Sequence, residues 1–317
     1  MNITLVEQWL GLLVDLGRAD ATIKAYRRAL AHYLCYCDEQ SISPQAVRFE
    51  DFAGYIRPQL PGMKHPVASA TLQLRISAIR LWYDFLHYQD ICEINPVPRS
   101  ILPSPMLNGR GLVPRIVKLP HIPDDKTWFT ILNLVATAPL RNRLMLALAY
   151  YGALRRAELT ALRINDLDLG HRLICIRAET TKNHRERIVC YSPAITPILA
   201  AHLQQLRQDG FTHGELFRSV SDRNYGAPLS IWSWSKIVRH WAKQATLPDF
   251  STHTLRHLRL THLARAGWKL HELATYAGHR DPKTTQIYLH LSGTELAAKM
   301  AGAVANLDLK VANVIFQ

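Results

Sequence analysis

A proline-rich segment near residue 100 limits what this chain can fold into more than any other feature. Prolines recur at short intervals within residues 96–123, at positions 96, 98, 103, 105, 114, 120 and 123. No regular helix or central strand runs through such a stretch, because proline lacks the backbone N–H and clashes with the preceding turn. The segment also carries Arg110, Arg115 and Lys118, with no acidic residue from 106 to 118. We therefore expect two folding units joined by an extended, basic linker.

The part before the linker is predicted to be entirely helical. Apolar side chains at helical spacing indicate four helices, at about residues 5–16, 21–37, 49–56 and 68–87. In the first helix the expected buried stripe is Leu5, Trp9, Leu12 and Leu16. Four such helices suffice for a small all-α domain, to which we assign residues 1–95.

The part after the linker is predicted to combine helices with a small sheet. Residues 172–177 and 187–191 have the β-branched and apolar content of strands, and the polar stretch 179–186 joins them as a hairpin loop. Helices are expected at about 141–151, from 156, and at 194–208, 230–245, 252–265 and 269–277, with a last periodic segment from 281. The expected fold class is mainly α with a small β-sheet, in which an α+β domain at 124–291 follows the helical one.

Composition and charge narrow the possible functions. Hydrophobic residues make up 48% and charged residues 20%, which is typical of globular proteins. No apolar run approaches the roughly 20 residues that span a bilayer, and the N-terminus lacks a basic signal region, so a cytoplasmic protein is expected. The 38 Lys and Arg against 25 Asp and Glu favour a polyanionic partner, above all nucleic acid, although a basic but otherwise ordinary enzyme stays open. Five cysteines without a Cys-x-x-Cys pair indicate neither a disulfide framework nor a cysteine zinc site.

Four short motifs carry side chains suited to chemistry. Arg155 and Glu158 lie at a break between helices, and Lys182 lies in the hairpin loop. His253-Thr-Leu-Arg256-His257 opens a helix, and Ala277-Gly278-His279 precedes Tyr288 by nine residues, counted from the histidine. Each motif alone has an ordinary structural explanation, such as a capping pair, a solvated turn residue or a core aromatic.

Together the motifs closely resemble the catalytic domain of the tyrosine recombinases, also called the phage integrase family. The resemblance covers most of residues 120–291, and the four N-terminal helices are similar, through weaker motifs, to the family's SAM-like core-binding domain. The family order of Arg, Lys, His-x-x-Arg, His or Trp, and Tyr falls here on Arg155, Lys182, His253, Arg256, His279 and Tyr288. The chain starts almost directly with the helical domain, so it resembles the simple, two-domain Xer-like members.

The resemblance implies a site-specific DNA recombinase. Such an enzyme cleaves and rejoins strands through a 3′-phosphotyrosine intermediate and a Holliday junction, as a homotetramer on two DNA sites with inverted repeats. A heteromeric recombinase partner is a further option, and the expected location is the cytoplasm, at the nucleoid. Two alternatives are a type IB topoisomerase-like enzyme that relaxes DNA and a sequence-specific DNA-binding protein without recombinase activity; the complete set of six residues argues against a decayed site.

These residue types suit the cleavage of a phosphodiester even without the family resemblance. Arg155 and Arg256 suit the non-bridging oxygens of a phosphodiester, because a guanidinium binds phosphate in a bidentate way and stays charged. Tyr288 supplies the nucleophile of a covalent step, and Lys182 supplies the general acid for the leaving 5′ oxygen. His253 either takes the tyrosine proton or steadies the phosphate.

The remaining site residues are assigned supporting roles. His279 is expected to donate a hydrogen bond to the phosphate, and Glu158 and His257 to support the site from behind. His253, His257 and His262 are spaced for one helix, which is the arrangement of a metal site, but the chain lacks His-Glu-x-x-His and an acidic cluster. We expect neither metal nor ATP, because the bond energy is stored in the phosphotyrosine.

Surface residues complete the prediction. Lys24, Arg27 and Arg28 lie on one face of the second helix, and Arg75 and Arg80 are expected to point outward from the fourth. They are either solvated faces or, as the resemblance favours, DNA contacts together with the basic residues of the linker. In the tail at 292–317, a stripe of Leu296, Met300, Val304 and Leu307 predicts an amphipathic helix that docks on a neighbouring subunit or packs on its own domain.

Overall fold

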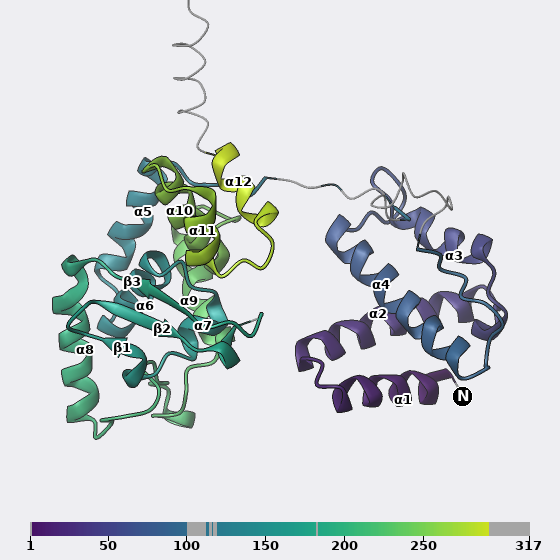
Figure 1. Cartoon of the computed structure of the whole chain (residues 1–317), viewed down its shortest axis with the longest axis horizontal. Helices are drawn as coiled ribbons and strands as arrows, with labels where there is room; N and C mark the ends of the chain where they lie inside the picture. The colour runs from purple at the N-terminus through teal and green to yellow at the C-terminus, as the bar shows by residue number, and fades with distance from the viewer. Residues whose placement is uncertain (1, 100–111, 114–115, 117–118, 182, 292–317) are drawn as a thin grey trace, which may run out of the picture. The chain divides into compact units, whose positions relative to one another are not determined.

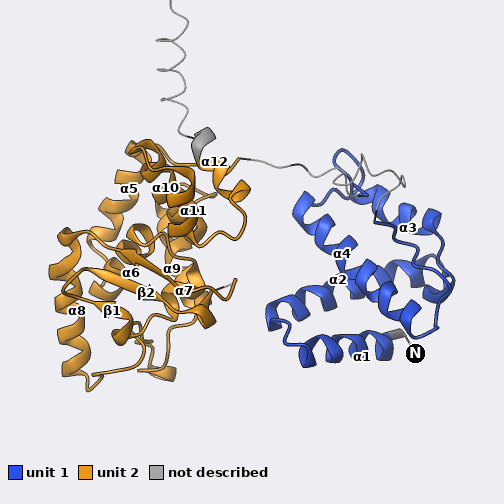
Figure 2. Ribbon diagram, viewed as in Figure 1, with its two compact units in different colours: residues 1–118 blue, residues 119–317 orange. Residues whose placement is uncertain are grey.

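The computed structural model describes residues 2–99, 112–113, 116, 119–181 and 183–291. The chain divides into two compact units, residues 1–118 and 119–317 (Figure 2). This division falls inside the segment expected to be a linker. Two residues of that segment are nevertheless part of a core, because Val97 and Val113 are buried in the hydrophobic cluster of the N-terminal unit.

The N-terminal unit consists of the four predicted helices (Figure 1). They are α1 (Asn2–Asp15), α2 (Asp20–Glu39), α3 (Phe49–Ile56) and α4 (Ser69–Tyr88). Helix α2 packs against both α4 and α1. The expected stripe of α1 is wrong in part: Leu12 and Leu16 are 44% and 77% exposed, whereas Val6, Trp9 and Leu10 are buried. Helix α1 ends at Asp15 and meets its neighbours along the Trp9 side, so its last leucines reach solvent.

The C-terminal unit contains a larger set of helices around a small sheet. Its helices are α5 (Asp125–Ala136), α6 (Leu140–Tyr151), α7 (Arg156–Thr160), α8 (Thr196–Gln208), α9 (Ile231–Gln244), α10 (Thr252–Arg265), α11 (Leu270–Ala277) and α12 (Lys283–Leu291). Its strands are β1 (Leu167–Asp168), β2 (Leu173–Ile176) and β3 (Arg187–Cys190). The expected fold class, mainly α with a small sheet, is confirmed.

Two elements were not predicted from the sequence. Helix α5 begins directly after the proline-rich segment, where the side chain of Asp124 accepts a hydrogen bond from the backbone N–H of Thr127 at 2.8 Å and caps the first turn. Strand β1 has two residues, too few to show alternation.

The register of the antiparallel sheet places the side chain of one arginine, Arg187, in the core. The strand order is β1-β2-β3, and Ile176 of β2 pairs with Arg187 of β3. Because successive side chains of a strand point to opposite faces, β3 buries Arg187 and Val189 and exposes Ile188 and Cys190. A buried arginine requires a charged or carbonyl partner, which the site supplies.

Helix α10 is the central element of the unit, since it packs against α6, α9, α11 and α12. Side chains on α10 can therefore meet residues from most of the chain after the linker. Within the described residues, no helix is both long and apolar enough to cross a bilayer. The predicted tail helix lies outside the described residues.

Candidate active site

Arg256 on α10 joins three separate parts of the chain. Its side chain is buried, with a relative exposure of 1%. Its guanidinium donates to the carbonyl oxygen of Ala153 at 2.6 Å and to the carbonyl oxygen of Ala277, and Nη2 lies 3.0 Å from Nε2 of His279. The arginine thereby fixes the turn before α7 and the end of α11 against α10.

Arg155 is held at the start of α7 by Glu158. The backbone N–H of Arg155 donates to Oε2 of Glu158 at 2.8 Å, and its guanidinium donates to Oε1 at 2.7 Å. A second guanidinium nitrogen reaches the carbonyl oxygen of Gly278 at 3.4 Å. The Arg155 side chain keeps 21% of its surface exposed, so this cation is positioned and still accessible to a ligand.

Arg187, which the sequence analysis did not identify, is the second partner of Glu158. It forms a bidentate pair with that carboxylate at 3.0 and 2.7 Å, and the side chains of Arg187 and Glu158 are 5% and 1% exposed. Burial by itself raises the pKa of Glu158, but the hydrogen bonds and charges of Arg187 and Arg155 outweigh it and lower the pKa to about 2. Glu158 is therefore ionised at neutral pH. The inward position of Arg187 in the predicted strand is the signal that could have revealed it.

Gly278 permits this arrangement at the end of α11. Its φ of 63° is left-handed, and a Cβ there would lie 3.1 Å from Cδ of Arg187. Tyr276, two residues earlier, has a structural role. Its hydroxyl donates to the carbonyl oxygen of Tyr151 at 2.7 Å, and its carbonyl oxygen accepts a hydrogen bond from Nε of Arg187 at 3.0 Å. A larger residue at 278 would displace the arginine that holds Glu158.

Tyr288 on α12 is buried inside this group, with 2% of its surface exposed. Its hydroxyl lies 2.8 Å from Nδ1 of His257, and its ring stacks on His279 at a centroid distance of 6.3 Å. Burial raises the pKa of Tyr288, while the positive charges of Arg256 and Arg155 act in the opposite direction. The structure thus brings the predicted nucleophile together with both predicted arginines.

His279 adopts one tautomer. A guanidinium has only donors, so Nε2 of His279 accepts from Arg256, and Nδ1 carries the proton and donates to Oγ1 of Thr285 at 2.8 Å. Burial, Arg256 and Arg155 lower the pKa of His279 to about 3. The predicted donation from His279 to a phosphate therefore requires a rearrangement of this contact.

The other histidines of α10 have separate partners. The His253 side chain is exposed, and its ring centroid lies 4.8 Å from that of His257. Desolvation and the neighbouring arginines lower the pKa of His253, and burial, His253 and Arg256 lower the pKa of His257 to about 4. His262 instead contacts the hydroxyl of Tyr150 at 2.7 Å. The three histidines that suggested a metal site thus engage different groups.

Lys182 lies outside the described residues, between β2 and β3. Its neighbour Asn183 donates from Nδ2 to the carbonyl oxygen of Gly278 at 3.2 Å. The hairpin loop is therefore tied to the turn that carries His279.

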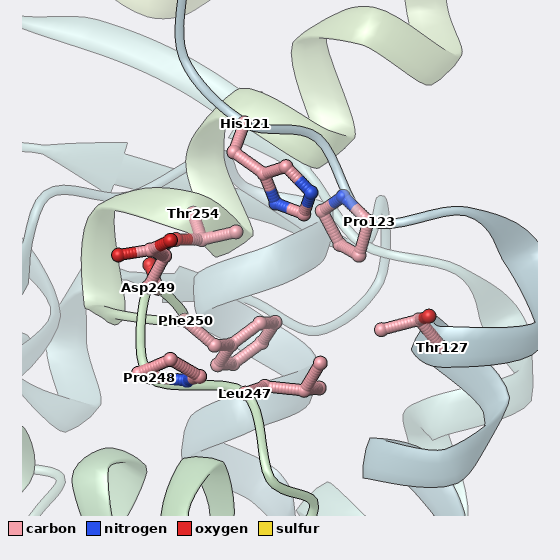
Figure 3. Close-up of a pocket in the computed structure, with 8 residues that line it drawn as sticks. All are labelled: His121, Pro123, Thr127, Leu247, Pro248, Asp249, Phe250 and Thr254. Carbon is pink, nitrogen blue, oxygen red and sulfur yellow. The ribbon is translucent and has the colours of Figure 1, made fainter.

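A separate pocket of about 220 Å³ lies behind the turn that leads into α10. Figure 3 shows its lining, which comes from the end of the linker, the start of α5, the segment before α10 and the first turn of α10: His121, Pro123, Thr127, Leu247, Pro248, Asp249, Phe250 and Thr254. None of the predicted catalytic residues lines it. The candidate active site is thus distinct from this concavity.

The predicted DNA-contact residues of α2 are exposed but partly paired. Lys24 contacts Asp20 at 2.6 Å, and Arg27 forms a bidentate pair with Glu7 at 2.8 and 2.7 Å. Arg28 is exposed. Surface pairs of this kind are weak, so these cations can exchange to phosphate at little cost.

The expected outward face of α4 is wrong for Arg80. This half-buried arginine donates to the carbonyl oxygens of Val97 at 3.1 Å and Pro98 at 2.9 Å, so it fixes the segment after the helical unit. Arg75, also half-buried, donates to Oε1 of the buried Gln59. Arg110, Arg115 and Lys118 of the linker lie outside the described residues.

A basic face on α9 was missed. Trp232, Lys236, Arg239 and Lys243 are all exposed and recur at intervals of four, three and four residues, and α9 contains no acidic residue. The guanidinium of Arg156 lies 5.3 Å from the ring centroid of Trp232. We call these four residues the α9 basic face; their spacing was readable from the sequence, and its first member, Trp232, contacts the residue that follows Arg155.

Comparison with known proteins agrees with both units. Residues 125–295 match the phage integrase family, and residues 6–90 match the phage integrase N-terminal SAM-like domain. The chain is 28% identical over 302 residues to tyrosine recombinase XerC of Pelotomaculum thermopropionicum, covering 90% of this chain and 92% of that protein. It is 29% identical over 292 residues to tyrosine recombinase XerD of Lacticaseibacillus casei, with the same shares covered.

Two solved structures share the fold. The XerH site-specific recombinase in a post-cleavage complex with its palindromic difH substrate gives a TM-score of 0.69 at 20% identity, covering 87% of this chain and 79% of that one. A lambda integrase (75–356) dimer bound to a COC′ core site gives a TM-score of 0.67 at 14% identity, covering 90% and 94%. The family matches span most of both units. The chain belongs to the phage integrase family, as a tyrosine recombinase of the Xer-like type.

Proposed function

We propose that this site-specific DNA recombinase uses Tyr288 to cleave DNA and forms a 3′-phosphotyrosine intermediate. The observation that carries the proposal is the burial of the Tyr288 phenol against His257 and His279, beside Arg256, in a site where the only described carboxylate contact of Arg155 and Arg187 is Glu158. Three arginines share the carboxylate of Glu158 or lie beside it, so an excess of positive charge gathers where a phosphodiester would be attacked.

Arg155 and Arg256 are proposed to bind the non-bridging oxygens of the phosphate from different positions. Arg155 offers an accessible guanidinium whose orientation Glu158 fixes, which is the preorganisation that phosphoryl transfer requires. Arg256 is held by two carbonyl oxygens, and its Nη2 also contacts Nε2 of His279, whose ring stacks on that of Tyr288. Together they would stabilise the charge on the non-bridging oxygens as the phosphorus becomes five-coordinate.

Lys182 is proposed to protonate the leaving 5′ oxygen. In the sequence it stands between β2 and β3, and Asn183 and Arg187, which both follow it, contact the turn at residues 276–278. Its place directly before Asn183 supports this assignment. The phosphotyrosine keeps the energy of the broken bond, so rejoining requires neither ATP nor metal.

DNA is proposed to contact both units. In the C-terminal unit the α9 basic face leads away from Arg155, and in the N-terminal unit Lys24, Arg27 and Arg28 of α2 supply phosphate contacts. We assign residues 1–95 to DNA binding, 96–123 to the linker, 124–291 to catalysis and 292–317 to docking on a neighbour. A homotetramer on two inverted-repeat sites at the nucleoid would then exchange strands through a Holliday junction, in line with family membership.

Trapping the covalent intermediate tests the proposal. The substrate is a nicked duplex built from inverted repeats in the DNA that flanks the gene, so that the cleaved strand diffuses away. Tyr288→Phe keeps the ring and loses only the oxygen, so we expect DNA binding without a covalent band on a denaturing gel. Tyr276→Phe serves as the control and should still form the band. A covalent band from Tyr288→Phe would place the nucleophile elsewhere.

A further inference from the structure

The hydroxyl of the proposed nucleophile contacts one histidine directly. Among the described residues, the hydrogen-bond partner of Oη of Tyr288 is Nδ1 of His257, at 2.8 Å. With 2% of Tyr288 exposed, solvent has little access to this oxygen. The proton that must leave the phenol before attack therefore has one immediate acceptor.

The other two histidines of the site are directed elsewhere. His253 lies one helical turn before His257 and meets that ring edge-on, at 4.8 Å between centroids. The His279 ring lies nearly parallel to the Tyr288 ring, 10° from it, and its nitrogens contact Arg256 and Thr285. A role for either histidine as the first acceptor of the tyrosine proton requires a contact that the structure does not contain.

We propose that His257 is a catalytic residue, the proton acceptor for Tyr288 during strand cleavage; this inference rests on the proposed role of Tyr288 as nucleophile. In the resting state Nε2 of His257 carries its proton and Nδ1 accepts from the phenol. The O–H bond of Tyr288 breaks as the N–H bond at Nδ1 forms, and Oη bonds to phosphorus. The bond from phosphorus to the 5′ oxygen breaks, and that oxygen takes a proton from the general acid. Rejoining reverses each transfer.

The surroundings of His257 suit this exchange. Arg256 and His253 on its own helix, His279 from the turn after α11 and Tyr288 from α12 face it. Burial, together with His253 and Arg256, lowers the pKa of His257 and keeps the free imidazole neutral, so Nδ1 has a lone pair to offer. DNA then brings a phosphodiester charge to the same place, which offsets the imidazolium formed by the transfer. The basicity of Nδ1 of His257 therefore increases only when the substrate is bound.

Two variants separate acceptance of a hydrogen bond from acceptance of a proton. In His257→Asn the side-chain oxygen takes the approximate place of Nδ1 and accepts a bond, but it cannot take the proton; His257→Leu does neither. His262→Asn is the matched control, because His262 lies on the same helix as His257 and its Nδ1 also contacts a tyrosine hydroxyl, that of Tyr150 on α6, at 2.7 Å. Thermal unfolding and DNA binding are measured for each variant first.

Single-turnover cleavage of the nicked duplex gives the result. We expect a loss of about 10²–10³-fold in rate for His257→Asn and little change for His262→Asn. The wild-type rate should rise with pH through the titration of one histidine, and His257→Asn should lack that limb. Fluorotyrosine at position 288, with a more acidic phenol, should restore much of the His257→Asn rate.

The outcomes distinguish the inference from the proposed function. A wild-type rate and pH profile in His257→Asn would overturn the role of His257 and leave Tyr288 as the nucleophile. A slow His257→Asn enzyme that fluorotyrosine does not rescue would also overturn it, because only the structural contact would then matter. A covalent band from Tyr288→Phe would instead refute the function on which the inference rests.

Discussion

Replacing Glu158 by Gln removes the negative charge that holds two arginines of the site. Glu158 is 1% exposed and forms a bidentate pair with Arg187. Its pKa of about 2 lies more than two units below the ordinary value, which corresponds to about 3 kcal/mol of folding free energy. Removing one partner of a buried pair costs a similar amount, roughly 3–5 kcal/mol. In a unit of this size we expect the melting temperature to fall by about 6–12 °C.

The dependence on pH has a definite sign. The pKa of Glu158 is lowered in the folded state, so the unfolded chain binds the extra proton between about pH 2 and pH 4.5. The stabilisation is therefore complete above that window and is lost as the pH falls through it. The difference in stability between the wild type and Glu158→Gln should be constant near neutral pH and should shrink toward pH 2.

Calorimetry of the whole chain, with the transition of the C-terminal unit followed over pH, measures both quantities. Glu179→Gln is the control, because Glu179 contacts Arg177 at 2.6 Å but is 66% exposed; an exposed pair contributes at most about 1 kcal/mol. Equal losses in the two variants, or a loss below about 1 kcal/mol in Glu158→Gln, would refute the assignment of a strong buried pair.

Three further predictions concern DNA. Lys182→Ala should slow cleavage by about 10²–10⁴-fold with little effect on binding, and a 5′-bridging phosphorothiolate, which leaves without a proton, should restore the rate. Changing Lys236, Arg239 and Lys243 together to Ala should lower the slope of log affinity against log salt by about 2.7, if each neutralises one phosphate. Deleting residues 294–317 should leave a folded, DNA-binding protein that recombines poorly, as light scattering and a recombination assay would show.

Each of these can fail in a specific way. If the phosphorothiolate does not rescue Lys182→Ala, another group is the general acid. An unchanged salt slope would remove the α9 basic face from the DNA interface; the scattered exposed cations Arg207, Arg223 and Arg265 provide a control triple. A truncated chain that melts earlier but still forms tetramers would indicate that the tail packs on its own unit.

The sequence predicted the fold where periodicity was strong. The stripe of α4 from Leu72 to Leu86 is buried as expected, since a long helix repeats its apolar spacing often enough to define one buried face. The prediction from sequence failed where an element was short or followed a segment with a different pattern. Strand β1 is two residues long, and α5 begins behind a run of prolines that we read as linker.

The candidate site was predictable in its reactive residues but not in their partners. Arg155, His253, Arg256, His279 and Tyr288 stand in motifs that carry their own chemistry. Arg187 and Thr285 have no motif, because their roles arise from strand register and from the tautomer of a neighbouring histidine. The expected outward position of Arg80 was wrong, since a helical wheel shows which way a side chain leaves the helix but not that the next segment folds back over it.

The charge balance of the site explains why its histidines are neutral and why it suits a polyanion. Among the described residues of the site, the guanidinium groups of Arg155 and Arg187 pair with the carboxylate of Glu158 and Arg256 lies nearby, so positive charge exceeds negative charge in a partly buried volume. Protonating His257 or His279 would add to this excess, so burial and the arginines hold both pKa values far below the ordinary one. A phosphodiester would supply the missing negative charge and relax the repulsion in the step in which, as proposed, a proton leaves Tyr288. On that proposal, the same excess of positive charge binds the substrate and couples its arrival to activation of the nucleophile.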